Sequence, residues 1–213
     1  MRNSILEKVL VAGACLLACT SAWGQSGDDT EKNWKASTDL GLIFAAERAY
    51  IAPGNCDCFW FNGGGSDVTV TLWKGLGITA ALTGDHASNV TPGVDISKIA
   101  YMAGPRYTYK PWFLKMRAGS KLPVQVFGEG LFGGVHAFDG AFPSATSVQT
   151  SANSYAMQIG GGVHFFVSRS FTLRALEADY VRTALPNGGS DVQNDLRLGV
   201  GVTYHLASFP HLH

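Results

Sequence analysis

The sequence of this chain predicts an all-β protein, an eight-stranded antiparallel up-and-down transmembrane β-barrel. Three observations predict this fold class. The 213-residue chain begins with an export signal, eight later segments alternate apolar with small or polar residues, and charged residues make up only 15% of the chain. Because a strand places successive side chains on opposite faces, each alternating segment has one apolar face and one less apolar face.

Residues 1–24 are predicted to be a cleaved secretory signal peptide. A charged start is followed by the apolar run Val9–Cys19 and then by small residues, with Ala22 and Gly24 at the −3 and −1 positions before Gln25, the pattern of such signals. The apolar run, about 11 residues, is too short to cross a membrane as a helix. Leu16-Leu17-Ala18-Cys19 also resembles a lipoprotein box, so lipidation of Cys19 stays an alternative. After the signal we expect a periplasmic segment over 25–36, the barrel over 37–206 and a C-terminal tail over 207–213.

The first four strands are predicted over Ser37–Arg48, Ser66–Trp73, Leu76–Asp85 and Ile99–Lys110. In the first, Leu40, Leu42 and Phe44 share a face. The second and third are separated by a tight turn at Lys74-Gly75. Alternation of period 2, bounded by turn residues, is the signal for each of these strands.

The last four strands are predicted over Val124–His136, Ser154–Val167, Phe171–Thr183 and Asn194–Leu206. The final strand alternates most regularly. Its apolar row runs from Leu196 to Leu206, and its other row holds Arg197, two glycines, Thr203 and His205. We interpret each as a strand of one sheet.

The composition of the two rows decides which face points outward. A soluble barrel would carry its apolar row inside and a row rich in Lys, Glu and Asp outside. Here the less apolar rows consist of Gly, Ala, Thr and Gln with a few isolated charges, which makes a poor water-facing surface. We therefore predict that the apolar rows contact outer-membrane lipid and that the small and polar rows fill a narrow interior.

The connections alternate in length, and this alternation predicts the orientation. The long connections are expected over Ala49–Gly65, His86–Lys98, Ala137–Asn153 and Ala184–Gln193. The short ones are Lys74-Gly75 and Ser168–Ser170, and Pro111–Pro123 is a longer exception. Outer-membrane barrels have short periplasmic turns, so both chain ends are predicted to be periplasmic.

Six charged residues are predicted to lie inside the barrel as an ion-pair network of structural or gating character. They are Arg106, Glu129, Arg174, Glu177, Asp179 and Arg197. An unpaired charge would be costly there, so the three acids are expected to face Arg174 and Arg197. Arg174 and Glu177 differ in parity, and a bulge near Ala175-Leu176 is needed for both to point inward.

Other kinds of chemistry have weak support in the sequence. Cys56 and Cys58 lie in a turn-rich segment and are expected to be a free or locally bridged loop pair, with metal binding as an alternative. The six histidines are scattered, so no metal site is predicted. No catalytic pair and no cofactor motif is found, and the near-neutral charge shows no basic patch for nucleic acid.

The ordered set of strand sequences resembles the eight-stranded OmpA-type outer-membrane β-barrel family, in a form common among envelope proteins of acidobacteria. The residues that carry the resemblance are GPRYTY, GEGLFGGVHA, SYAMQIGGGVHF, LRALEADYVRT and NDLRLGVGVTYHL, with NCDCFWFNGG before them. The resemblance implies a bacterial outer-membrane location, an interior charge cluster that plugs the lumen, and the barrel-assembly machinery as a partner. The family often ends on an aromatic residue, whereas Leu206 and ASFPHLH end this chain.

Three function classes follow from this reading. The first is a structural barrel for envelope integrity, with loops available for recognition of an unidentified ligand. The second is a low-conductance pore, because eight strands leave an interior filled by side chains. The third is a soluble ligand-binding barrel in the periplasm.

Overall fold

The structure is a computed structural model of the chain and describes residues 37–50, 58–109, 124–143, 147–168, 170–187 and 191–208. The predicted signal peptide over 1–24, the segment over 25–36, Cys56 and residues 209–213 lie outside these ranges. So does the whole of the predicted link Pro111–Pro123. Within the described ranges, no helix has the length and apolarity that a membrane span requires.

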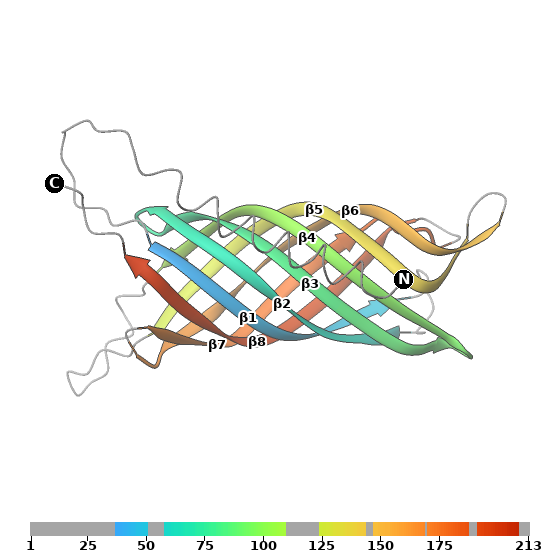
Figure 1. The fold of residues 1–213 in the computed structure, drawn as a ribbon, viewed down its shortest axis with the longest axis horizontal. Coiled ribbons are helices and arrows are strands. Elements are labelled where there is room, and N and C mark those ends of the chain that lie inside the picture. The colour runs from blue at the N-terminus through green and yellow to red at the C-terminus, as the bar shows by residue number, and fades with distance from the viewer. Residues whose placement is uncertain are drawn as a thin grey trace, which may run out of the picture. The chain divides into compact units, whose positions relative to one another are not determined.

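Eight strands form one closed barrel, in which each strand pairs antiparallel with its neighbour in the chain and β8 pairs with β1 (Figure 1). The strands are β1 Ser37–Tyr50, β2 Cys58–Trp73, β3 Leu76–Thr91, β4 Val94–Tyr109, β5 Val124–Pro143, β6 Val148–Phe166, β7 Phe171–Thr183 and β8 Gln193–Ser208. The predicted fold class is confirmed.

The paired strands are staggered around the barrel. Following register partners from Ser37 through all eight strands leads back to β1 at Glu47, ten residues further along the chain. A stagger of this kind requires strands that are tilted relative to the barrel axis, and Figure 1 shows the tilt. Residues joined by the register therefore follow a slope through the interior and do not lie in a flat ring.

Three of the predicted long loops are much shorter than expected, and this part of the prediction was wrong. β2 already begins at Cys58, and β3 and β4 are joined by a turn over Pro92 and Gly93. β5 continues to Pro143, and β6 begins at Val148. The segments that were predicted as loops and form strand ends are rich in Gly, Ser, Thr and Asn, a composition typical of loops. In the barrel, however, the backbone groups of these segments bond to neighbouring strands, and this pairing outweighs the weak strand propensity.

The short turn at Lys74-Gly75 is confirmed. Both residues have positive φ, 45° and 91°, the backbone of a two-residue hairpin turn. Gly75 is required there for a second reason, because a Cβ would lie 2.1 Å from the carbonyl oxygen of Thr108.

The apolar rows point outward, as predicted. On β8, Leu196 and Val200 are each about half exposed, whereas Arg197 and Thr203 are buried. The same alternation holds on β6, where Tyr155 and Ile159 are exposed and Gln158 is buried. This arrangement is opposite to that expected of a soluble ligand-binding barrel, so the outer surface suits hydrocarbon and the polar groups fill the interior.

Candidate functional site: a charged layer inside the barrel

All six charged residues selected from the sequence point into the barrel, and none is more than 7% exposed. Arg106 lies on β4, Glu129 on β5 and Arg197 on β8, while β7 carries Arg174, Glu177 and Asp179. β7 presents all three inward because its register shifts between Arg174 and Glu177, against both β6 and β8. The extra residue reverses the side-chain parity at that point.

The register explains why charges distant in sequence meet. Arg106 pairs with Glu129, Glu129 with Gly160, Gly160 with Asp179, and Asp179 with Arg197. Arg197 in turn pairs with Glu47 on β1. These five charges therefore follow one sloping row through six strands, and only Gly160 on β6 interrupts it.

Asp67 on β2 connects two arginines at the centre of the layer. Its carboxylate oxygens accept hydrogen bonds from Nη1 of Arg106 at 3.1 Å and from Nη2 of Arg174 at 2.9 Å. Arg106 also donates to Glu129 at 2.6 Å, and Nη1 of Arg174 donates to Glu177 at 2.9 Å. Because every member is buried, direct pairing is what compensates these charges.

One aromatic ring contacts both guanidinium groups of this cluster. The Cζ atoms of Arg106 and Arg174 lie 4.4 and 5.4 Å from the ring centroid of Phe127. The negative face of an aromatic ring attracts cations. Phe127 therefore stabilises two neighbouring positive charges that would otherwise repel each other.

A second set of ion pairs lies closer to the end of the barrel where the β3–β4 turn is found. Arg197 donates to Asp85 at 3.2 Å, and the Lys98 ammonium pairs with Glu47. The Lys98 Nζ atom also lies 4.3 Å from the ring centroid of Phe61. These pairs join β1, β3, β4 and β8.

Four of these ion-pair residues were not selected from the sequence: Glu47, Asp67, Asp85 and Lys98. The first three share the parity of inward residues on their strands, so strand alternation alone could have found them. Lys98 was missed because it was placed in a loop. The expected partners also differ, since Arg197 pairs with Asp85 and not with an acid of β5 or β7.

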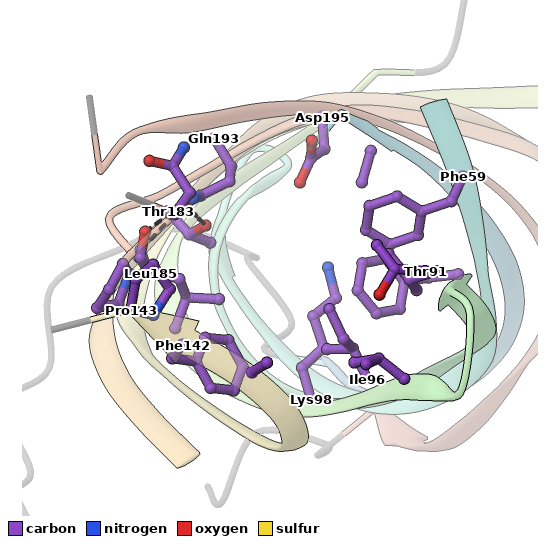
Figure 2. A pocket seen from close by; sticks show the side chains of 17 residues that line it. Phe59, Thr91, Ile96, Lys98, Phe142, Pro143, Thr183, Leu185, Gln193 and Asp195 are labelled. Atoms are coloured by element: carbon purple, nitrogen blue, oxygen red, sulfur yellow. Dashed lines mark hydrogen bonds between the residues drawn. The ribbon is translucent and has the colours of Figure 1, made fainter. Parts of the chain in front are cut away.

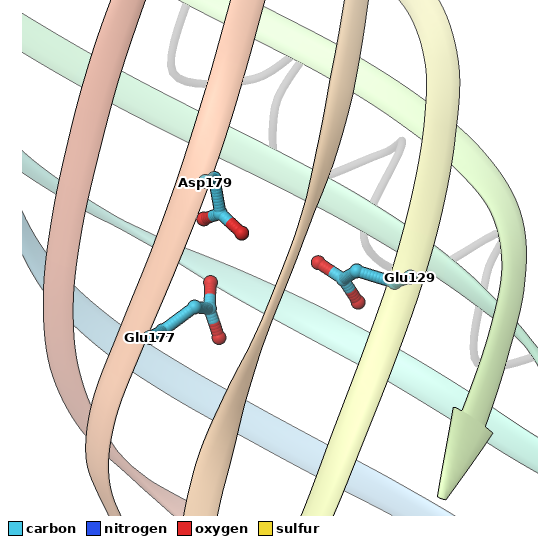
Figure 3. Close-up of side chains that lie close together, drawn as sticks. All are labelled: Glu129, Glu177 and Asp179. Carbon is cyan, nitrogen blue, oxygen red and sulfur yellow. The ribbon is translucent and has the colours of Figure 1, made fainter.

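Three carboxylates, those of Glu129, Glu177 and Asp179, gather at one point with their oxygens within 4.8 Å of one another (Figure 3). Glu129 and Glu177 each pair with an arginine, whereas the oxygens of Asp179 have no hydrogen-bond partner in the described part of the chain. Gly160 provides the space, because a Cβ there would lie 1.9 Å from Oδ1 of Asp179. The group has the oxygen chemistry to hold a proton or a cation.

Of the two cysteines predicted to lie in a loop, only Cys58 is among the residues that the structure describes. Cys58 is the first residue of β2, opposite Tyr50, and forms no disulfide with any residue that the structure describes. Its sulfur accepts a hydrogen bond from Nη2 of Arg48 at 3.5 Å. The expectation that Cys58 belongs to a loop was therefore wrong, since strand pairing extends to this residue.

One cavity lies on each side of the charged layer. A polar vestibule of about 710 Å³ is bounded by Asp39, Arg106, His164 and His205, at the end where β1 begins and β8 ends. An apolar cavity of about 250 Å³ lies at the other end and reaches Lys98 and Asp195 (Figure 2). The ion pairs occupy the barrel between them.

This architecture is found in a solved structure. Neisserial surface protein A matches with a TM-score of 0.57 and 16% identity, over 82% of this chain and 99% of the neisserial chain. The fold is that of a small outer-membrane β-barrel. Two more such barrels have TM-scores of 0.48: Ail of Yersinia pestis, with 15% identity over 81% and 98% of the two chains, and OprG of Pseudomonas aeruginosa, with 10% over 81% and 97%. No protein-family model matches, and no curated protein is similar enough to count as a relative.

Proposed function

We propose that this protein is a bacterial outer-membrane barrel with a structural role in envelope integrity, exported through a cleaved signal peptide. The observation that supports the role is the charged layer, which fills the barrel with interlocking ion pairs from β1, β2, β3, β4, β5, β7 and β8. A barrel closed in this way stiffens the membrane-spanning part and blocks a wide diffusion path.

The partners in this proposal are outer-membrane lipid and, during insertion, the barrel-assembly machinery. Exposed aliphatic and aromatic side chains on every strand support the lipid contact. Membership of the OmpA-type family and recognition of a ligand by the loops are finer parts of the same proposal. The proposal assigns no catalytic role.

The test is permeability of vesicles that contain the folded barrel. Folding is first checked by electrophoresis, where a closed barrel migrates faster unboiled than boiled. We expect such vesicles to resist swelling in an isotonic disaccharide solution, as protein-free vesicles do, and a large porin serves as the positive control. Rapid swelling would contradict a closed structural barrel.

A low-conductance ion path is the second candidate, and the charge balance of the interior favours it. Among the described residues, the buried acids Glu47, Asp67, Asp85, Glu129, Glu177, Asp179 and Asp195 outnumber the buried bases Lys98, Arg106, Arg174 and Arg197. An acidic lining attracts cations. Small conductance steps in a planar bilayer, with a reversal potential near that of K⁺ in a KCl gradient, would support this candidate.

A further inference from the structure

The apolar cavity lies at the end of the barrel opposite the polar vestibule, and its walls are mainly apolar. Phe59, Phe61, Ile96, Phe142 and Leu185 line it, and they come from β2, β4, β5 and the segment after β7 (Figure 2). Its volume is about 250 Å³.

The change from apolar to charged side chains occurs along the inward face of a single strand. On β2 the inward row begins with Phe59 and Phe61, passes through glycines, and continues with Asp67 and Thr69. No register shift separates the two parts, because the pairing of β2 with β1 is continuous from Cys58 to Thr71. The same strand face is therefore apolar in the cavity and charged in the layer below it.

Three of the polar residues that line the cavity, Lys98, Thr183 and Gln193, are bound to neighbouring groups. The Lys98 ammonium pairs with Glu47 and lies 4.3 Å from the ring centroid of Phe61. At the rim, the Gln193 amide accepts from Thr183 Oγ1 and from the Leu185 backbone N–H, both at 3.0 Å, and donates to the Leu185 carbonyl at 2.7 Å. A molecule in the cavity would contact mainly hydrocarbon and rings, so a charged ligand would gain no new ion partner from these groups.

We propose that the apolar cavity is a binding site for a small neutral apolar molecule of about ten carbon atoms, the size of a two-ring aromatic. The size follows from the volume, since a cavity of roughly 150 Å³ lined by Leu, Ile and Phe holds one benzene molecule. Removing apolar surface of ligand and cavity from water supplies the affinity. This site requires only the barrel fold and goes beyond the proposed structural function.

The experiment is titration of the folded barrel in phospholipid nanodiscs with naphthalene, followed by carbon-13 methyl NMR of the isoleucines. Ile96 lines the cavity, whereas Ile78 and Ile159 face outward and report naphthalene dissolved in lipid. We expect a saturable shift at Ile96 and only a non-saturating drift at Ile78 and Ile159. A response of Ile96 that merely parallels that of Ile78 would overturn the proposal.

Two matched variants locate the site. Leu185→Asp places a charge in the cavity wall outside the strands and is expected to weaken the Ile96 titration about tenfold or more, because burying that charge is costly. Val148→Asp, an exposed position at the start of β6 that does not line the cavity, should leave the midpoint unchanged. An unchanged midpoint in Leu185→Asp would refute the site. If Ile96 responds to exchange of myristoyl for oleoyl phospholipid and not to naphthalene, the cavity holds an acyl chain and the proposal is wrong.

Discussion

Arg174 and Asp67 form an ion pair across 107 positions of the chain: Nη2 of the arginine lies 3.0 and 2.9 Å from the two carboxylate oxygens. The pair joins β7 to β2 through the interior, and the arginine is 1% exposed. Since Asp67 also accepts from Arg106, one carboxylate compensates two buried cations.

The first prediction concerns this shared carboxylate. Asp67→Ala should lower the free energy of unfolding by about 3–5 kcal/mol, because it leaves two buried guanidinium groups with one fewer anion. Urea unfolding of the barrel in lipid vesicles measures the change. Asp139→Asn is the control, because it removes an exposed negative charge on β5 and asparagine tolerates the φ of 61° at that position; it should change stability by less than about 0.5 kcal/mol. Equal effects of the two variants would show that the Asp67 pairs do not stabilise the fold.

The second prediction separates two glycines that the sequence does not distinguish. Gly160→Ala should destabilise the barrel by about 1–3 kcal/mol, because its Cβ would lie 1.9 Å from Oδ1 of Asp179 and 2.4 Å from the backbone oxygen of Ala178. Gly130→Ala on β5 meets nothing within 4 Å and should be neutral or slightly stabilising. Thermal loss of the fast-migrating unboiled band compares the two. The argument fails if Gly160→Ala melts at the same temperature as Gly130→Ala.

The third prediction has the opposite sign to the first. Asp179→Asn should raise the free energy of unfolding by about 1 kcal/mol, because the amide can donate a hydrogen bond to a neighbouring carboxylate where Asp179 has no donor. Urea unfolding in lipid vesicles measures the gain. Glu177→Gln is the comparison, since Glu177 pairs with Arg174, and we expect it to be destabilising. A loss of stability in Asp179→Asn would mean that the acid has a partner after all.

The fourth prediction tests the lipid-facing rows. Val200→Arg, at a half-exposed outward position near the middle of β8, should cost about 2–4 kcal/mol in a bilayer. Val148→Arg, at the start of β6, should cost about 0–1 kcal/mol, because the penalty falls towards the membrane surface. The refolding yield and the urea midpoint in vesicles measure the cost of each substitution. Similar costs at the two positions would contradict the proposed placement of the barrel in the membrane.

Several parts of the charged layer could be predicted from alternation, and others could not. Six inward charges follow from parity together with one bulge near Ala175, and the register of β7 shifts there. The partners do not follow from parity, since Asp67 and Asp85 contact arginines from strands on other sides of the barrel. Pairing through the interior depends on how far the strands are staggered, and no local pattern encodes that stagger.

The sequence by itself determined the number of strands, the face of each that meets hydrocarbon, and the tight turn at Lys74-Gly75. These properties are local, because they follow from a two-residue side-chain period and from turn chemistry within a few residues. Only the tertiary structure decided where the hairpins end, which acid meets which base, and that Phe59 and Leu185 enclose a cavity. Closure of the barrel sets these features, because the ten-residue stagger between Ser37 and Glu47 brings distant residues to the same level.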